Sequence, residues 1–223
     1  MSKIEQNYKN LLSVIKSSQS EGDAEALPTI IAVSKTRTLK EIDEAYKCGL
    51  RNFGENYLQE AVSKINSCQH SLTWHFIGSI QSNKAKQIAQ YFQWVHTITR
   101  FKIAQKISQH REEPMNVCLQ VKLQNDDPRD SVVFDDLPAL AEKVNDLKNI
   151  RLRGLMGMTS GDLRVNERSK YFKKLTEAFD NLNHQGFNLD TISMGMSGDY
   201  DLAIQNRSNM IRIGTALFGK RST

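Results

Sequence analysis

The sequence is poor in the features that cross-link a protein or anchor it. Its three cysteines, Cys48, Cys68 and Cys118, are far apart and odd in number, so they fit neither a disulfide framework nor a paired-cysteine zinc site. The five histidines show no metal-ligand spacing, and we expect no metal. No apolar run reaches the roughly 18 residues of a membrane helix, and the start shows no apolar signal core. These absences predict a cytoplasmic protein without a membrane partner.

The composition is that of an ordinary folded protein. Hydrophobic residues make up 39% of the 223 residues and charged residues 25%, a composition that does not predict a disordered chain. The net charge of +5 would permit a phosphate-bearing partner. The basic residues are scattered in single positions and small groups, such as Lys173 with Lys174 and Arg151 with Arg153, so we expect no nucleic-acid partner.

Short apolar runs alternate along the chain with segments whose apolar residues recur at helical spacing. This alternation is typical of strands separated by helices. After a first helix over 4–16, the apolar runs predict eight strands, at 29–35, 51–55, 73–79, 94–98, 116–123, 151–158, 191–197 and 210–218. The segments between them predict seven connecting helices, at 39–48, 58–65, 83–92, 101–110, 137–147, 171–182 and 202–208.

Strands that alternate with helices pair in parallel through right-handed crossovers. Eight such units in 223 residues match an α/β fold, a closed (β/α)8 TIM barrel that forms a single domain over residues 1–223 with an extra N-terminal helix. An open doubly wound sheet is the alternative. It is disfavoured because no Gly-x-Gly-x-x-Gly pattern follows the first strand, where such sheets bind dinucleotides.

Lys35 stands at the end of the first predicted strand, Ile-Ile-Ala-Val-Ser-Lys. Alternation places Ile31, Val33 and Lys35 on one side, and we expect that side to face the barrel interior. Functional residues of this fold stand at the C-terminal ends of strands. An amine that has lost part of its hydration there can attack an aldehyde. The alternative is a lysine that extends past the strand into solvent.

The last two predicted strands carry groups that can bind a phosphate. The seventh ends in Ser197 and Gly198, beside a helix that begins near Asp199, and a helix N-terminus favours an anion. In the eighth, Arg212 and Gly214 share a face, and glycine lets backbone amides approach a ligand. A buried guanidinium needs a partner, which a pyridine nitrogen or a carboxylate could supply. The alternative is that Ser197 or Asp199 only caps the helix.

Six motifs extend this pattern over most of the chain. They are Ala-Val-Ser-Lys-Thr at 32–36, Phe-Gly-Glu-Asn-Tyr at 53–57, Trp-His-Phe-Ile-Gly at 74–78, Leu-Arg-Gly-Leu-Met at 152–156, Gly-Met-Ser at 195–197 and Arg-Ile-Gly-Thr-Ala at 212–216. With these motifs the chain resembles the pyridoxal phosphate homeostasis proteins nearly end to end.

The resemblance implies a barrel similar to the N-terminal domain of bacterial alanine racemase. It also implies pyridoxal 5'-phosphate as cofactor, held as a Schiff base on Lys35. The other cofactor-binding residues that it implies are Ser197, Gly214 and Thr215 at the phosphate, Arg212 at the pyridine nitrogen and Asn56 at the cofactor's edge.

Two segments depart from the family's pattern. Residues 122–133 replace a polar stretch that commonly ends in Lys-x-Gly, and residues 156–160 lack a proline that relatives often carry near the strand end. Neither segment includes the lysine or the phosphate positions. His75, Gln81 and Asn83 also match family positions, but no chemical role follows for them.

The resemblance favours a cofactor carrier over an enzyme. Alanine racemases take a second acid/base group, a tyrosine, from a C-terminal β domain of the partner subunit. This chain ends four residues after Gly219, and we expect no such domain. An arginine at the ring nitrogen keeps that nitrogen unprotonated, which weakens the ring as an electron sink.

We therefore expect a protein of pyridoxal phosphate homeostasis, with no catalytic residue and without significant turnover. The alternative is an amino-acid racemase or another aldimine enzyme with the same cofactor. The expected partners are the cofactor and the apo-enzymes that depend on it, and we expect the chain to be a monomer.

Overall fold

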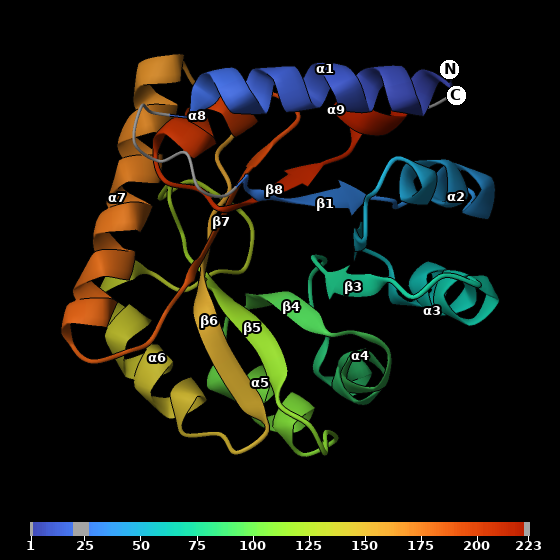
Figure 1. Cartoon of the computed structure of the whole chain (residues 1–223). Helices are drawn as coiled ribbons and strands as arrows, with labels where there is room; N and C mark the ends of the chain where they lie inside the picture. The colour runs from blue at the N-terminus through green and yellow to red at the C-terminus, as the bar shows by residue number, and fades with distance from the viewer. Residues whose placement is uncertain (1, 20–26, 221–223) are drawn as a thin grey trace.

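The computed structural model describes residues 2–19 and 27–220, within which eight parallel strands close into a barrel. Figure 1 shows the last strand beside the first, and Thr29 pairs with Met210 where they meet. The predicted TIM barrel is therefore confirmed. The strands are β1 (Thr29–Val33), β2 (Asn52–Glu55), β3 (Thr73–Phe76), β4 (Trp94–Ile98), β5 (Met115–Gln120), β6 (Ile150–Met156), β7 (Thr191–Met196) and β8 (Met210–Ile213).

Helices surround the barrel, and the expected helix before the first strand is present (Figure 1). The α-helices are α1 (Lys3–Ser18), α2 (Leu39–Lys47), α3 (Leu58–Ser67), α4 (Ala85–Tyr91), α5 (Phe101–Ser108), α6 (Leu137–Asn145), α7 (Val165–His184), α8 (Tyr200–Gln205) and α9 (Thr215–Phe218). Two short 3-10 helices, η1 (Ser82–Lys84) and η2 (Phe134–Asp136), precede α4 and α6.

Helix α1 lies across α8 and α9, as Figure 1 shows. The side-chain amide of Asn7 donates a hydrogen bond to the carbonyl of Leu217, with 2.8 Å between nitrogen and oxygen. The apolar residues Ile4, Leu11 and Ile15 of α1 are buried. Their spacing of seven and four residues places them on one helix face, which explains why this helix packs on the barrel rather than remaining in solvent.

Local signals in the sequence set the ends of several helices. The hydroxyl of Thr38 accepts from the backbone N–H of Glu41, and the carboxylate of Glu41 accepts from the backbone N–H of Thr38, which forms a capping box at the start of α2. After α7 the chain turns at Gly186, whose φ of +95° lies in the left-handed region that glycine tolerates.

Two element boundaries differ from the predicted ones by more than three residues. The eighth strand was expected over 210–218, but it ends at Ile213 and residues 215–218 form α9. Leu217 and Phe218 of α9 are buried, and a short buried helix has the same continuous apolar sequence as a buried strand. Helix α7 begins at Val165 instead of 171, because its first turns are exposed and carry no apolar period.

The alternation of side chains along the strands divides the apolar residues into two layers. The larger layer lies between the barrel and the helices and includes Ile30, Phe53 and Phe172. A separate cluster fills the barrel interior. Its buried members are Ile31, Trp94, Cys118, Met156 and Met210. Ile31 belongs to the inner cluster and Ile30 to the outer layer, as the alternation in the first strand predicts.

The close pairing of β6 and β7 leaves no room for a side chain at Gly154. A Cβ atom there would lie 1.7 Å from the carbonyl oxygen of Thr191, so the strands would have to separate. We expect Gly154→Ala to lower the free energy of unfolding by about 3 kcal/mol. Gly161→Ala is the matched control, because its Cβ atom would meet nothing within 4 Å. Urea unfolding measures both, and equal midpoints for the two variants would contradict the packing argument.

Candidate functional site

Lys35 lies just beyond the C-terminal end of β1 and is half-buried. The strand ends two residues earlier than expected, at Val33. The next residue after the lysine, Thr36, has a φ of 61°, a left-handed conformation that is unfavourable for a β-branched side chain. The chain therefore turns sharply after Lys35, and the position of the lysine depends on the contacts that hold this turn.

Side chains of α3 hold the backbone on both sides of Lys35. The ammonium of Lys64 donates to the carbonyl oxygen of Ser34, at 2.6 Å. The backbone N–H of Thr36 donates to Oε1 of Glu60, at 2.5 Å, and Lys64 donates to the same carboxylate oxygen. These bonds fix the backbone on either side of Lys35, and with it the point from which the lysine side chain extends.

Glu55 completes this buried group. It is fully buried, and its Oε1 accepts from the hydroxyl of Ser34, at 2.6 Å, and from Lys64, at 2.8 Å. Burial raises the pKa of the Glu55 carboxyl, while the bonds to Lys64 and Ser34 act in the opposite direction. A buried ion pair of this kind fixes geometry more than it stabilises the fold.

Ser197 and the segment after β8 come together at the same end of the barrel. The Ser197 hydroxyl oxygen accepts from the backbone N–H groups of Gly214, at 3.2 Å, and Ala216, at 3.1 Å. Two converging backbone donors beside a hydroxyl form a group that can bind a phosphate oxygen. Thr215, which lies between them, is exposed. The structure therefore brings together Ser197, Gly214 and Thr215.

The alternative role of these residues, capping of the following helix, is not observed. No side chain caps the start of α8. The carboxylate of Asp199 accepts from the Thr159 hydroxyl, at 3.0 Å, and from the backbone N–H of Met196, at 2.7 Å. Asp199 therefore fixes the end of β7 instead of capping α8.

Asn56 follows the C-terminal end of β2 and is half-buried. Its Oδ1 atom is buried, and within the part of the chain that the structure describes it has no hydrogen-bond partner. An unpaired buried acceptor is unfavourable unless something binds to it. Four consecutive strands of the barrel are each followed by one of the candidate residues. Ser197 follows β7, Gly214 follows β8, Lys35 follows β1 and Asn56 follows β2.

Arg212 points into the barrel interior, since Ile211 and Ile213 on either side of it belong to the outer apolar layer. The guanidinium donates to the carbonyl oxygen of Ser193 at 2.8 Å, to the Ser193 hydroxyl at 2.7 Å and to the carbonyl oxygen of Gly157 at 2.9 Å. These acceptors are all neutral. Burial lowers the pKa of Arg212 to about 10, so the side chain remains a cation at neutral pH.

A line of polar side chains continues from Ser193 through the barrel. The Ser193 hydroxyl bonds with Nδ1 of His96 at 2.9 Å, and Nε2 of His96 with Nδ1 of His75 at 3.0 Å. Nε2 of His75 bonds in turn with Oδ1 of Asn52 at 3.0 Å. Both imidazoles are fully buried, which lowers the pKa of His75 to about 3 and the pKa of His96 well below its usual range.

Sequence reasoning assigned no role to the residues that hold Arg212. It named His75 without a function, considered His96 only as a metal ligand, and did not name Ser193 or Asn52. One signal was available, because a serine interrupts the apolar seventh strand, Thr-Ile-Ser-Met-Gly-Met, two residues after Thr191. In a fully buried strand such a serine requires a hydrogen-bond partner inside the protein.

The divergent segment 122–133 lies near this end of the barrel. Gln124, Asp127 and Arg129 of this segment line a hollow together with Ser160 and Met196. Arg129 forms an ion pair with Asp127, with 2.6 Å between nitrogen and oxygen. The segment therefore borders the strand ends that carry the candidate site.

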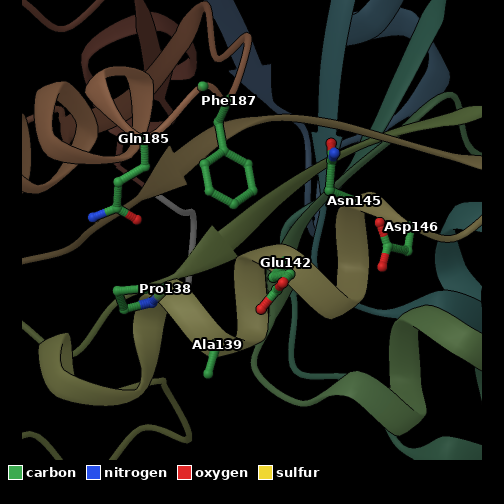
Figure 2. A pocket seen from close by; sticks show the side chains of 8 residues that line it. Pro138, Ala139, Glu142, Asn145, Asp146, Gln185 and Phe187 are labelled. Atoms are coloured by element: carbon green, nitrogen blue, oxygen red, sulfur yellow. The ribbon is translucent and has the colours of Figure 1, made fainter.

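A different pocket lies on the outside of the barrel, away from these strand ends. Figure 2 shows Pro138, Ala139 and Glu142 of α6 opposite Gln185 and Phe187 from the segment between α7 and β7. That segment leads into the N-terminal end of β7. In this fold the N-terminal face serves stability, so this pocket is not the candidate site.

Residues 2–19 and 27–220 contain neither a metal-binding cluster nor a membrane-spanning helix. No three histidine, cysteine, aspartate or glutamate side chains in these ranges are arranged to bind a metal ion. None of the helices in the same ranges has the length and apolar character needed to cross a membrane.

The family model described as "Alanine racemase, N-terminal domain" matches residues 1–222 of the chain. Solved structures agree: PipY of Synechococcus elongatus without PLP is 33% identical, has a TM-score of 0.87 and covers 97% of this chain and 100% of its own. The same protein with PLP bound gives a TM-score of 0.86. An alanine racemase of Clostridium difficile, 16% identical, shares the fold with a TM-score of 0.79 over 98% of this chain and 58% of its own. These matches place the chain in the class of alanine racemase-like barrels.

Curated relatives narrow this class. The pyridoxal phosphate homeostasis protein of Pseudomonas aeruginosa is 45% identical over 226 residues, which cover 99% of this chain and 97% of the relative. The protein of that name from Vibrio alginolyticus is 40% identical and covers 99% of both chains. The chain therefore belongs to the family of the pyridoxal phosphate homeostasis proteins.

The two buried histidines predict that acid destabilises the protein. Below pH 6.5 an unfolded chain protonates both, whereas the folded chain keeps them neutral, so stability falls as the pH falls. Between pH 7 and pH 5 we expect a loss of about 2 kcal/mol for each histidine. The raised pKa of Glu55 opposes this loss, because the folded chain then retains a proton longer.

Urea unfolding at pH 7, 6 and 5 measures this dependence. His96→Gln removes one of the two groups, so its stability should change less steeply with pH than that of the wild-type chain. His110→Gln is the control, because His110 is exposed. The explanation fails if His96→Gln and His110→Gln lose stability with the same slope.

Proposed function

We propose that this chain binds pyridoxal 5'-phosphate as a Schiff base on Lys35 and acts in the homeostasis of that cofactor, without significant enzymatic turnover. The observation that carries the proposal is the placement of three sets of groups on adjacent strands of the barrel: a serine hydroxyl after β7, a buried arginine with two converging backbone N–H groups on and after β8, and a half-buried lysine after β1. The names of the relatives and the PLP-bound PipY structure support the choice of cofactor.

The residues present fit this cofactor at each of its polar parts. The N–H groups of Gly214 and Ala216 donate to the Ser197 hydroxyl oxygen in this structure, and a rotation of that side chain would turn both N–H groups and the hydroxyl to the phosphate, with Thr215 at its edge. The buried guanidinium of Arg212 would face the pyridine nitrogen. The unpaired Oδ1 of Asn56 marks a buried polar position that a bound molecule would cover.

Lys35 would make the covalent link. Its Nζ would bind the aldehyde carbon as an imine, with the aldehyde oxygen and the two amine protons released as water. Lys64 and Glu60 fix the backbone on either side, so that the lysine is positioned before the cofactor arrives. When bound, pyridoxal phosphate supplies an electron-withdrawing ring, whose strength depends on protonation of the ring nitrogen.

Arg212 limits that strength. With a pKa of about 10 it is a cation at neutral pH, and a cation beside the ring nitrogen disfavours a second positive charge there. An unprotonated ring stabilises a carbanion poorly, so Arg212 favours storage over turnover. We assign no catalytic residue.

The wider role follows the same proposal. The chain would act in the cytoplasm as one cofactor-binding domain over residues 1–223, as a monomer, and the recipients of its cofactor would be apo-enzymes that depend on pyridoxal phosphate. We propose neither a metal nor a nucleic-acid partner.

Borohydride reduction tests the link to Lys35. Incubation with pyridoxal phosphate followed by reduction should leave one stable adduct, which peptide mass spectrometry assigns to Lys35. Lys35→Ala should abolish the adduct, because no amine remains at that position to form the imine. Lys40→Ala, which removes an exposed lysine of α2, should leave it unchanged. An adduct on another lysine, or none in the wild-type chain, would refute the proposal.

Exchange of α-protons separates a carrier from an enzyme. In deuterated water the loaded protein should exchange the α-proton of alanine and other amino acids no more than slightly faster than free pyridoxal phosphate does, because Arg212 keeps the ring a weak electron sink. Proton NMR measures the exchange as the loss of the amino acid's α-proton signal. Rapid exchange would favour the alternative function, an amino-acid racemase or a related enzyme.

A further inference from the structure

The polar residues inside the barrel form one continuous line between non-adjacent strands. Asn52, His75 and His96 stand on the neighbouring strands β2, β3 and β4, while Ser193 and Arg212 stand on β7 and β8. The bond between His96 and Ser193 therefore crosses the barrel interior, at 2.9 Å. Barrel interiors are normally filled by bulky apolar side chains, so this polar crossing needs an explanation.

The side-chain oxygen of Asn52, which faces His75, sets the direction of the hydrogen bonds. Oδ1 of Asn52 accepts, so Nε2 of His75 carries a proton. A neutral imidazole has a single N–H, which makes Nδ1 of His75 an acceptor and Nε2 of His96 its donor. By the same rule, Nδ1 of His96 accepts from a hydroxyl.

This direction determines what Ser193 offers to Arg212. The hydroxyl proton of Ser193 is donated to His96, so the lone pairs of its oxygen remain for the guanidinium, which can only donate. Every proton of the line thus points away from Arg212. The positive charge of Arg212 polarises each bond in turn, and bonds polarised in sequence strengthen one another.

We propose that Asn52, His75, His96 and Ser193 are positioning residues that hold Arg212 as a fixed cation toward the cofactor's ring nitrogen. The inference rests on the proposed function, since it concerns the same site. The second contact of the guanidinium, the carbonyl of Gly157, lies just beyond the C-terminal end of β6. Arg212 is thereby held between the line of side chains and the end of the barrel that carries Lys35.

The line itself is tested without cofactor. In protein labelled with 15N at histidine, long-range proton–nitrogen correlation should show His75 and His96 neutral and protonated at Nε2 between pH 6 and pH 8. Ser193→Ala removes the donor to His96, so the His96 Nδ1 resonance should move to the position of a nitrogen without a hydrogen bond. A charged imidazole, or a proton on Nδ1 of either ring, would overturn the assigned direction.

Ser208→Ala is the matched control. Ser208 is a buried serine between the same two strands, and its hydroxyl donates to the carbonyl oxygens of Ile192 and Met194, outside the line. The same chemical change at Ser208 should leave both histidine spectra unchanged. Ser193→Cys provides a second variant with a weaker donor and acceptor, in case the alanine variant does not fold, and its His96 shift should be intermediate.

Positioning of Arg212 is tested with cofactor. The ring-nitrogen resonance of 15N-labelled pyridoxal phosphate should shift in Ser193→Ala, shift less in Ser193→Cys and match the wild type in Ser208→Ala. If the cofactor binds and its ring-nitrogen resonance has the same position in Ser193→Ala and Ser208→Ala, the positioning role is refuted while the proposed function stands. If the wild-type chain binds no cofactor, the proposed function fails, and the histidine spectra still decide the direction of the line.

Discussion

A single buried guanidinium determines how the interior of this barrel is built. An ion of this kind is far more stable in water than in an apolar core, so each of its donors must meet an acceptor. Arg212 meets the oxygens of Ser193 and Gly157, and Ser193 is oriented by His96. The barrel interior therefore has a polar part, formed by Arg212 and the side chains that hold it, and an apolar part, the cluster that includes Ile31 and Met210. With an apolar residue at position 212, Ser193 would have no guanidinium to accept from, and the two histidines would no longer be needed to orient it.

The contacts that position Lys35 lie outside the barrel, and those that position Arg212 lie inside it. Lys35 depends on Lys64 and Glu60 of α3, outside the strands, whereas Arg212 depends on side chains inside them. Two independent sets of contacts thus converge on one small site. Rigid support of this kind lets a site hold a bound group in one orientation.

The sequence predicted most of the fold and the outline of the site, for a physical reason. Strands, helices and strand ends follow from local periodicity, and Lys35, Ser197 and Gly214 all stand at strand ends. Contacts between distant strands have no local signature, so the bond from His96 to Ser193 could not be read from either segment. Likewise, α9 was taken for part of a strand because a short, mostly apolar sequence such as Thr-Ala-Leu-Phe fits both structures.

The pairing of β1 with β8 affects how the protein is made. Thr29 can meet Met210 only after the ribosome has delivered the last strand, and α1 also rests on α8 and α9. Until then a nascent chain exposes an unpaired strand edge and the apolar face of α1, two features that invite aggregation. Contacts so distant in sequence form slowly, and we expect the newly made protein to benefit from chaperones during synthesis.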